Sequence, residues 1–171
     1  MTVSIRPATV DDMAAVNALY NALVASTTVA WTDEPEPLER RIAWFHEQQT
    51  NGFACFVAES DGTVIGYGSY GSFRGDGRWP GYRFTVEHSI HVDEHHWGLG
   101  AGRALMALLI ETARADGFHV MVGAVDADNV ASVAFHERMG FVEVARMPEV
   151  GRKFDRWLDL VLLQLRLDEP G

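Results

Sequence analysis

Three glycines at alternate positions, Gly98, Gly100 and Gly102, stand between an expected strand and an expected helix. Glycine lets the backbone turn tightly with no side chain in the way, so that the backbone N–H groups can face an anion. The positive end of the helix dipole favours the same ligand. We interpret the turn as a cradle for a pyrophosphate; a plain strand-to-helix turn is the alternative, because an isolated glycine motif is weak evidence.

Two common nucleotide-binding motifs do not fit this turn. A P-loop needs Lys and Ser or Thr directly after the last glycine, where this chain has Arg103 and Ala104. A dinucleotide fingerprint needs a third small residue three places after Gly100, and that place is also Arg103. Both motifs are therefore excluded.

The strand before the turn separates its side chains into two sets, because successive residues of a strand point to opposite faces. One face of the expected strand 83–92 carries Phe84, Val86, His88, Ile90 and Val92. The other face carries Thr85, Glu87, Ser89 and His91. A carboxylate, Glu87, is thus expected on a polar face that leads to the glycine turn.

Hydrophobic periodicity predicts the elements that position these residues. Helices are expected from about residue 9, from Pro37 with Leu38, Ile42 and Phe45 toward the core, and over 102–116 and 129–139. Strands are expected over 54–59, 64–70, 83–92, 119–125, 141–146 and 157–167, with a glycine-rich loop over 71–81. The prediction is an α+β fold in one domain over residues 1–171, with a mixed, mostly antiparallel sheet flanked by helices.

Composition limits the partners of the chain. The net charge of −10 repels phosphate backbones, so no nucleic-acid partner is expected. No stretch reaches the roughly 20 apolar residues that cross a bilayer, and no secretory signal is apparent, so we expect no membrane partner and a cytoplasmic protein. The single Cys55 cannot form an internal disulfide, and His91, His95 and His96 lack the spacing of a metal motif, so no metal is expected.

Two ordered motifs resemble those of the GNAT acetyltransferase superfamily. The segment from Val92 to Gly102 resembles its acetyl-CoA motif, with Trp97 where the family usually has Gln or Arg, and Asn129-x-x-Ser132-x-x-x-His136-x-x-x-Gly140-Phe141 resembles its second signature. The resemblance implies the GNAT fold, a sheet splayed at the acetyl-CoA site, and acetyl-CoA as co-substrate. It implies cofactor contacts from Ile90, His91, Val92, Gly98, Leu99, Gly100, Ala101, Gly102, Arg103, Asn129, Ser132 and His136.

A closer resemblance covers nearly the whole chain. Thr27-Thr28-x-x-Trp31, the run from Tyr82 to Ser89 and the run from Val150 to Asp159 are similar to the phosphinothricin and methionine sulfone/sulfoximine N-acetyltransferase group. This implies a small amino-acid-like amine as acceptor and, commonly, a homodimer. The segment 75–80 is longer than in that group.

Direct acetyl transfer to an amine needs a base, an oxyanion donor and an acid. The resemblance puts Glu87 at the position of a catalytic or substrate-binding carboxylate; a salt bridge is the alternative role. A backbone N–H near His91 and Val92 is expected to face the thioester carbonyl. His136 stands where the family often has a Tyr that protonates the departing thiolate, and it either acts as that acid or lines the pantetheine channel.

The acceptor is expected to contact Glu87, His88 and Ser89 together with two residues from loops. Arg74 is expected to clamp an acceptor carboxylate, with a solvated surface Arg as the alternative. Trp31 is expected to cover the acceptor side chain, with a place in the core as the alternative. Two other functions stay open: a protein or peptide N-terminal acetyltransferase, and a non-catalytic acyl-CoA-binding module.

Overall fold

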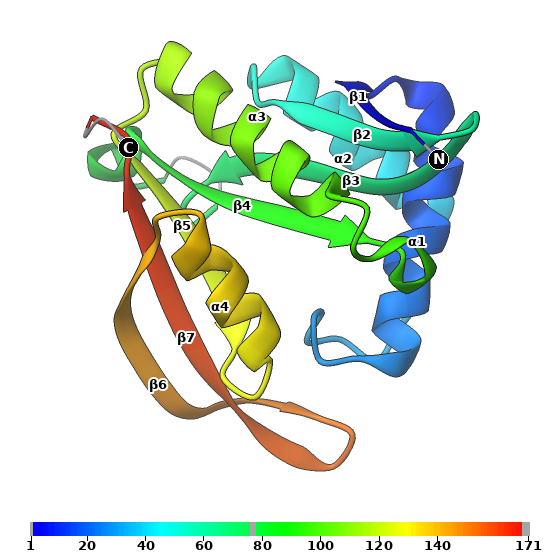
Figure 1. Ribbon diagram of the computed structural model, residues 1–171. Coiled ribbons are helices and arrows are strands. Elements are labelled where there is room, and N and C mark those ends of the chain that lie inside the picture. The colour runs from blue at the N-terminus through cyan, green and yellow to red at the C-terminus, as the bar shows by residue number, and fades with distance from the viewer. Residues whose placement is uncertain (1, 76–77, 169–171) are drawn as a thin grey trace.

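The computed structural model describes residues 2–75 and 78–168 and contains one seven-stranded sheet in the order β1-β2-β3-β4-β5-β7-β6 (Figure 1). The β4–β5 pair is parallel and the other pairs are antiparallel, which confirms the predicted mixed sheet. The strands are β1 (Val3–Pro7), β2 (Cys55–Ser60), β3 (Thr63–Ser72), β4 (Thr85–Val92), β5 (Val120–Asp126), β6 (Val142–Lys153) and β7 (Arg156–Arg166).

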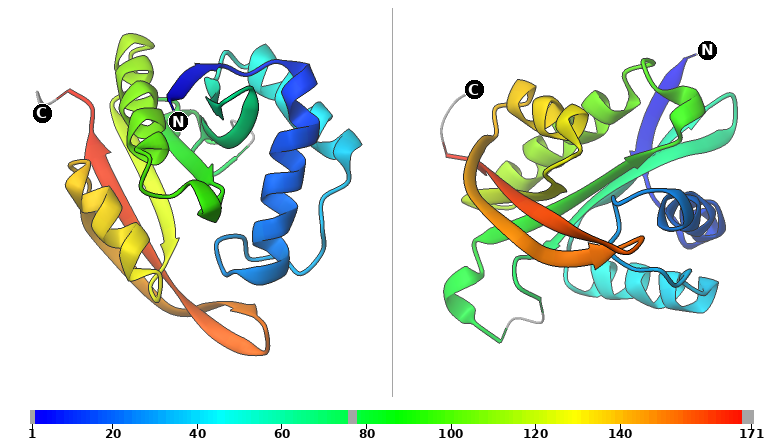
Figure 2. Two further views of the ribbon diagram at one scale, coloured as in Figure 1. Left: turned by 45° about the vertical axis from the view of Figure 1, so that its right-hand side comes forward. Right: turned by 90° about the horizontal axis from the view of Figure 1, so that it is seen from below.

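In the described part of the chain, four α-helices cover the two faces of the sheet: α1 (Met13–Ser26), α2 (Leu38–Thr50), α3 (Ala101–Ala115) and α4 (Val130–Arg138). The view from below shows α1 and α2 on one face and α3 and α4 on the other (Figure 2). Successive residues of a strand pack against opposite helix layers: Val57 packs with the α1/α2 core, whereas its neighbour Ala58 packs with Leu105 of α3.

The sheet opens between β4 and β5. These strands pair only at Thr85, Val86 and Glu87, whereas β4 stays paired with β3 as far as Val92. Beyond Glu87 the two strands diverge, and the gap between them is visible beside α4 (Figure 1). The predicted splay in the sheet is therefore confirmed.

Three details differ from the sequence prediction. Strand β1 was not predicted, because it is a five-residue edge strand that depends on pairing with β2. Strand β6 continues to Lys153, well beyond residue 146, in a hairpin with two register shifts against β7. Phe45 and Ile42 face the core as predicted, whereas Leu38 is exposed, and α2 also buries the polar residues Arg41 and Gln48. No helix among the described residues has the length and apolar character needed to span a bilayer.

Candidate active site

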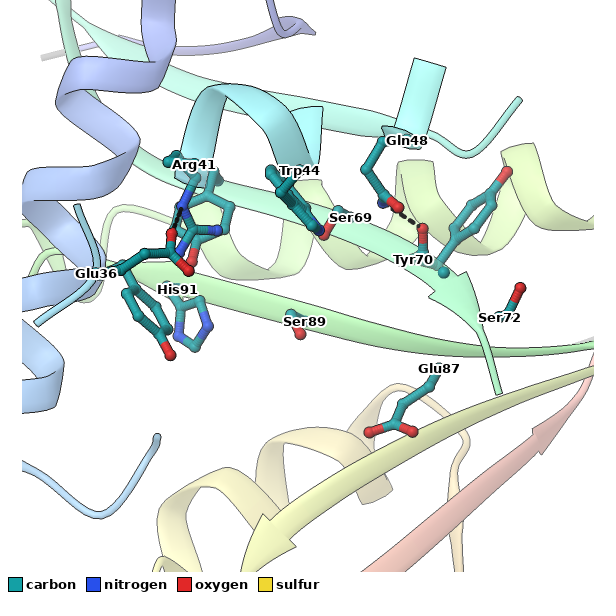
Figure 3. Close-up of a pocket in the computed structure, with 13 residues that line it drawn as sticks. Glu36, Arg41, Trp44, Gln48, Ser69, Tyr70, Ser72, Glu87, Ser89 and His91 are labelled. Atoms are coloured by element: carbon teal, nitrogen blue, oxygen red, sulfur yellow. Dashed lines mark hydrogen bonds and ion pairs between the residues drawn. The ribbon is translucent and has the colours of Figure 1, made fainter. Parts of the chain in front are cut away.

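A cavity of about 330 Å³ lies between the α1/α2 layer and strands β3 and β4 (Figure 3). It is lined by Tyr20, Glu36, Arg41, Trp44, Gln48, Tyr67, Ser69, Tyr70, Gly71, Ser72, Glu87, Ser89 and His91. The polar face predicted for β4 thus supplies Glu87, Ser89 and His91. In the close-up, Glu87 lies at one end of the cavity and Arg41, Glu36 and His91 lie at the other.

Glu87 lies where the sheet opens, because it is the last β4 residue that pairs with β5. Its side chain is half-buried, and burial raises the pKa of the carboxyl group. No described residue forms an ion pair or hydrogen bond with this carboxylate. The alternative role considered for Glu87, a salt bridge, is therefore not found among the described residues. The carboxylate is therefore free to accept a proton from a molecule in the cavity.

The backbone of β4 offers hydrogen-bond donors to the opening. Odd-numbered residues bond to the β3 side, as in the contact of Asp93 N–H with the Ile65 carbonyl at 2.9 Å. Because backbone groups alternate along a strand, the N–H groups of Ile90 and Val92 point toward the diverging β5. The donor predicted near His91 and Val92 is thus placed at Ile90 and Val92, and the N–H of His91 faces β3.

The glycine turn leads directly into α3. Gly98 and Gly100 have φ angles of 83° and 85°, which favour glycine, and a Cβ at either position would meet no atom within 4 Å. Gly100 is the N-cap of α3, and within the described chain no acceptor bonds to the backbone N–H groups of Gly98, Gly100 or Gly102. This arrangement fits a pyrophosphate.

Trp97 and the neighbouring residues frame that turn. The Trp97 indole is 68% exposed, and its Nε1–H donates to the Val92 carbonyl at 2.9 Å, so it braces the end of β4. Leu99 and Arg103 are exposed, and Ala101 is buried against Leu105. The Trp that replaces the expected Gln or Arg therefore keeps the turn in place without offering a polar group to it.

His136 and His88 form a buried pair on the α3/α4 side of the sheet, stacked with ring centroids 5.1 Å apart. Because the Ser132 carbonyl only accepts, His136 Nδ1 carries hydrogen and donates to it at 2.7 Å. His136 Nε2 then accepts from His88 Nε2–H at 3.2 Å. Burial lowers the pKa of both rings, that of His88 to about 3 with a contribution from His136.

This position corrects one predicted acceptor contact. The His88 side chain lies on the face of β4 opposite Glu87 and Ser89, packed against Phe141, so it does not reach the cavity. The physical reason is that His88 and Glu87 are neighbours on a strand, so their side chains point to opposite faces of the sheet.

In the predicted second signature, Asn129 caps α4, since its Oδ1 accepts from Ser132 N–H at 3.1 Å.

The two predicted loop contacts lie outside the cavity lining. Arg74 is exposed in a turn and donates to the Tyr82 hydroxyl at 3.3 Å. Trp31 packs on Gly151 of β6, so closely that a Cβ at position 151 would overlap the indole ring. Part of the segment 75–80, at residues 76 and 77, lies outside the described residues.

Arg41 is the cavity residue that sequence reasoning missed. It is 6% exposed, its Nε lies 2.7 Å from Glu36 Oε1, and its guanidinium lies over the rings of Tyr20, Trp44 and Tyr67. One signal was available: Arg41 and Gln48 flank Phe45 at helical spacing, so polar residues occupy the buried stripe of α2.

Burial, with a contribution from the Arg41 charge, lowers the pKa of His91 to about 4. The ring is therefore neutral at physiological pH. It packs against Tyr67, with centroids 5.1 Å apart, at the Arg41 end of the cavity. Over the described ranges, no group of three His, Cys, Asp or Glu side chains is placed to hold a metal ion.

The comparisons with known proteins agree with this geometry. Residues 16–141 match the model of the Acetyltransferase (GNAT) family. The chain is 46% identical over 169 residues to the L-methionine sulfoximine/L-methionine sulfone acetyltransferase of Pseudomonas paraeruginosa, covering 98% of this chain and 96% of that protein.

Two solved structures share the fold over almost their whole length. The acetyltransferase yncA from Salmonella typhimurium with its cofactor acetyl-CoA superposes with a TM-score of 0.93 at 42% identity, covering 100% of this chain and 97% of the other. The ribosomal-protein-alanine N-acetyltransferase from Brucella melitensis gives a TM-score of 0.91 at 41% identity, covering 95% and 99%.

Proposed function

The chain belongs to the GNAT acetyltransferase family and is an N-acetyltransferase with acetyl-CoA as its co-substrate, and from this premise we propose the acceptor and the roles of the residues. The proposed acceptor is the α-amine of a small amino-acid-like molecule of the methionine sulfone, methionine sulfoximine or phosphinothricin type. The observation that carries the proposal is the cavity of about 330 Å³ with the free carboxylate of Glu87 at the opening of the sheet. A relative at 46% identity named for sulfoximine and sulfone acetylation supports it.

Glu87 is proposed as the base for the acceptor amine. An ammonium group has no lone pair for attack, so a proton must leave it, and a carboxylate with a pKa raised by burial suits that task near neutral pH. Acetyl-CoA supplies the acetyl group as a thioester. The N–H groups of Ile90 and Val92 are positioned to donate to an oxygen that gains negative charge in the opening.

The glycine turn before α3 is proposed to bind the pyrophosphate of acetyl-CoA through its backbone N–H groups. The free N–H groups of the turn from Gly98 to Arg103 and the dipole of α3 provide this contact, with Asn129 and Ser132 at the start of α4 as further contacts. For His136 we favour the role of lining the channel over that of the acid. Its Nε2 accepts a hydrogen bond and its pKa is lowered, so at neutral pH it holds no proton there to donate.

Thiol release from acetyl-CoA by the purified protein tests the proposal. The acceptor panel contains methionine sulfone, methionine sulfoximine, phosphinothricin, ordinary amino acids and short peptides. Release with one of the first three supports the proposal, and release with none of them contradicts it. Acetyl-CoA binding measured in parallel identifies the outcome of a non-catalytic acyl-CoA-binding module.

A second candidate is acetylation of a protein or peptide N-terminus. It is favoured by one observation, the 41% identity to the structure named as a ribosomal-protein-alanine N-acetyltransferase. Thiol release with peptides that begin with alanine, and none with free amino acids, would select this candidate.

The protein is further proposed to be a cytoplasmic homodimer without a nucleic-acid or membrane partner. Its net charge of −10 disfavours nucleic acid. Edge strand β6 and its hairpin partner expose Val142, Val144, Val150 and Trp157, a surface suited to a second copy. Light scattering should give twice the monomer mass, and Val144→Lys should lower it; monomeric wild-type protein would contradict the dimer.

A further inference from the structure

The Arg41 end of the cavity has no role in the proposed chemistry. Arg41 projects from α2 and is 6% exposed, although a buried cation is costly unless its donors are paired. Its one ionic partner is Glu36, with Nε and Oε1 2.7 Å apart, among the residues that the structure describes. The contact is an ion pair without hydrogen-bond geometry, since neither Arg41 Nε nor Glu36 Oε1 has a hydrogen-bond partner.

The guanidinium therefore retains unused donors. A guanidinium has five N–H groups, and no acceptor in the described parts of the chain takes a hydrogen bond from any of them. Only Nε is sealed from solvent, so the two terminal nitrogens keep access to the cavity that Arg41 lines. A nearly buried cation with free donors beside a cavity is suited to an electron-rich oxygen from a ligand.

The surroundings hold Arg41 in one position. Its guanidinium carbon lies 4.5 Å from the Tyr20 ring centroid and 4.9 Å from that of Trp44, so two aromatic faces restrict it. Glu36 is fixed as well, because the side-chain amide of Asn21 bonds to both its N–H and its carbonyl, at 2.8 and 2.9 Å. The donors are thus pre-organised for a ligand.

Position along the strand determines which part of an acceptor reaches Arg41. His91, at this end, lies four residues beyond Glu87, which is about 13 Å along an extended strand. Ser89 lies between the two ends in the close-up (Figure 3). An α-carboxylate is one carbon atom from its amine, so in an acceptor whose amine lies at Glu87 the far end of the side chain, and not the carboxylate, is the group that can extend toward Arg41.

We propose that Arg41 binds the oxygen atoms on the sulfur or phosphorus of the acceptor side chain and so selects oxidised acceptors over methionine. This rests on the proposed function, and it adds the group that determines specificity. The neighbouring Glu36 carboxylate already compensates the charge of Arg41, so neutral sulfone oxygens are expected to bind better than an anionic phosphinate. Comparing the affinities of methionine sulfone and phosphinothricin distinguishes binding of neutral sulfone oxygens from binding of an anionic phosphinate.

Methionine sulfone and methionine form the matched acceptor pair, because they differ only in two sulfur-bound oxygens. Arg41→Met should lower kcat/KM for the sulfone by roughly 10- to 100-fold, mainly through KM, and change that for methionine much less. Arg40→Met is the control: it removes the same charge from the adjacent position, where the side chain is 78% exposed, and should leave the sulfone preference intact. Equal losses for both acceptors, or an unchanged preference, would overturn the proposal.

Binding without turnover separates this inference from the proposed function. Calorimetric titration of the wild-type protein should show tighter binding of methionine sulfone than of methionine, and Arg41→Met should abolish the difference even if thiol release fails. Wild-type protein that binds both equally, or neither, would overturn the subsite. If Arg41→Met does not fold, Arg41→Lys serves instead: it keeps the charge but loses the planar donor pair, so the sulfone preference should still fall.

Discussion

Arg41 and Lys153 are both buried cations, yet their hydrogen bonding is opposite. Lys153 is 1% exposed, and its Nζ donates at 2.7 Å to each of three carbonyls, those of Val24, Thr27 and Ala30. An ammonium has three hydrogens, so every donor is used. Arg41 uses none of its five donors in a hydrogen bond with the described residues. A saturated cation stabilises the fold, whereas an unsaturated one beside a cavity remains available to a ligand.

The two residues also differ in what they connect. Lys153 ends β6 and ties the β6–β7 hairpin to the C-terminal end of α1 and the segment that follows it, where the helix dipole favours a cation. The Thr28 hydroxyl bonds to Asp126 at the end of β5, and Trp31 packs on Gly151. These contacts connect the α1 side of the molecule, next to strands β1 to β4, with strands β5 to β7 on the other side of the opening. Among the described residues, Arg41 contacts only the first of these two parts. Glu87 resembles Arg41 in forming no hydrogen bond with the described residues, although Arg41 has an ionic partner in Glu36.

The largest expected effect is a loss of turnover without a loss of stability at Glu87, the opposite of what is expected at Lys153. Glu87→Gln should lower kcat by roughly 100- to 10,000-fold, because the amine loses its base. Stability should not fall, since the carboxylate has no partner among the described residues and burial disfavours its charge. Steady-state kinetics and thermal unfolding check both points. Equal weakening of acetyl-CoA binding and turnover would indicate a structural role instead.

Loss of Lys153 should act mainly on stability. Lys153→Met keeps the aliphatic stem but leaves three carbonyls without a donor, and should lower the free energy of unfolding by about 3 kcal/mol or more. Urea unfolding measures this change. Lys153 is the only lysine in the sequence, so its slow modification by an amine-reactive reagent in the native protein, and rapid modification after unfolding, would report the buried site by mass.

A smaller effect is expected at Gly151. Gly151→Ala places a methyl group on the Trp31 ring and should destabilise the protein by about 1–3 kcal/mol, because the indole must move. The double variant Gly151→Ala, Trp31→Ala tests the cause, since without the ring the methyl group should add little further loss. Full additivity of the two changes would show that the clash is not the reason.

The smallest expected effect is a displaced pH profile. Burial raises the pKa of Glu87, and the carboxylate is active only when ionised, so turnover should fall as pH drops through a value above that of an ordinary Glu. The sign for stability is opposite. A raised folded-state pKa adds stability below the unfolded-state pKa, and this is lost as pH rises through the folded-state pKa. Glu87→Gln should remove the acidic limb of kcat; its persistence would assign that limb to another group.

Local patterns predicted a large part of this site. The glycines at 98, 100 and 102 indicated the turn, and period-two alternation placed Glu87, Ser89 and His91 on one face, because both features depend only on neighbouring residues. Sequence alone did not place Trp31 and Arg74, whose surroundings depend on contacts with distant segments. It also did not predict the pairing of His88 with His136, 48 positions apart.

The sequence by itself determined the fold class, the glycine turn and the polar face of β4, since backbone geometry and periodicity act over short distances. Only the tertiary structure decided which charges are buried. Arg40 and Arg41 are adjacent and chemically identical, yet their side chains are 78% and 7% exposed. The difference arises from the rotation of α2 against the sheet, which is set by the packing of its apolar residues, such as Phe45, into the core cluster shared with α1 and not by either arginine.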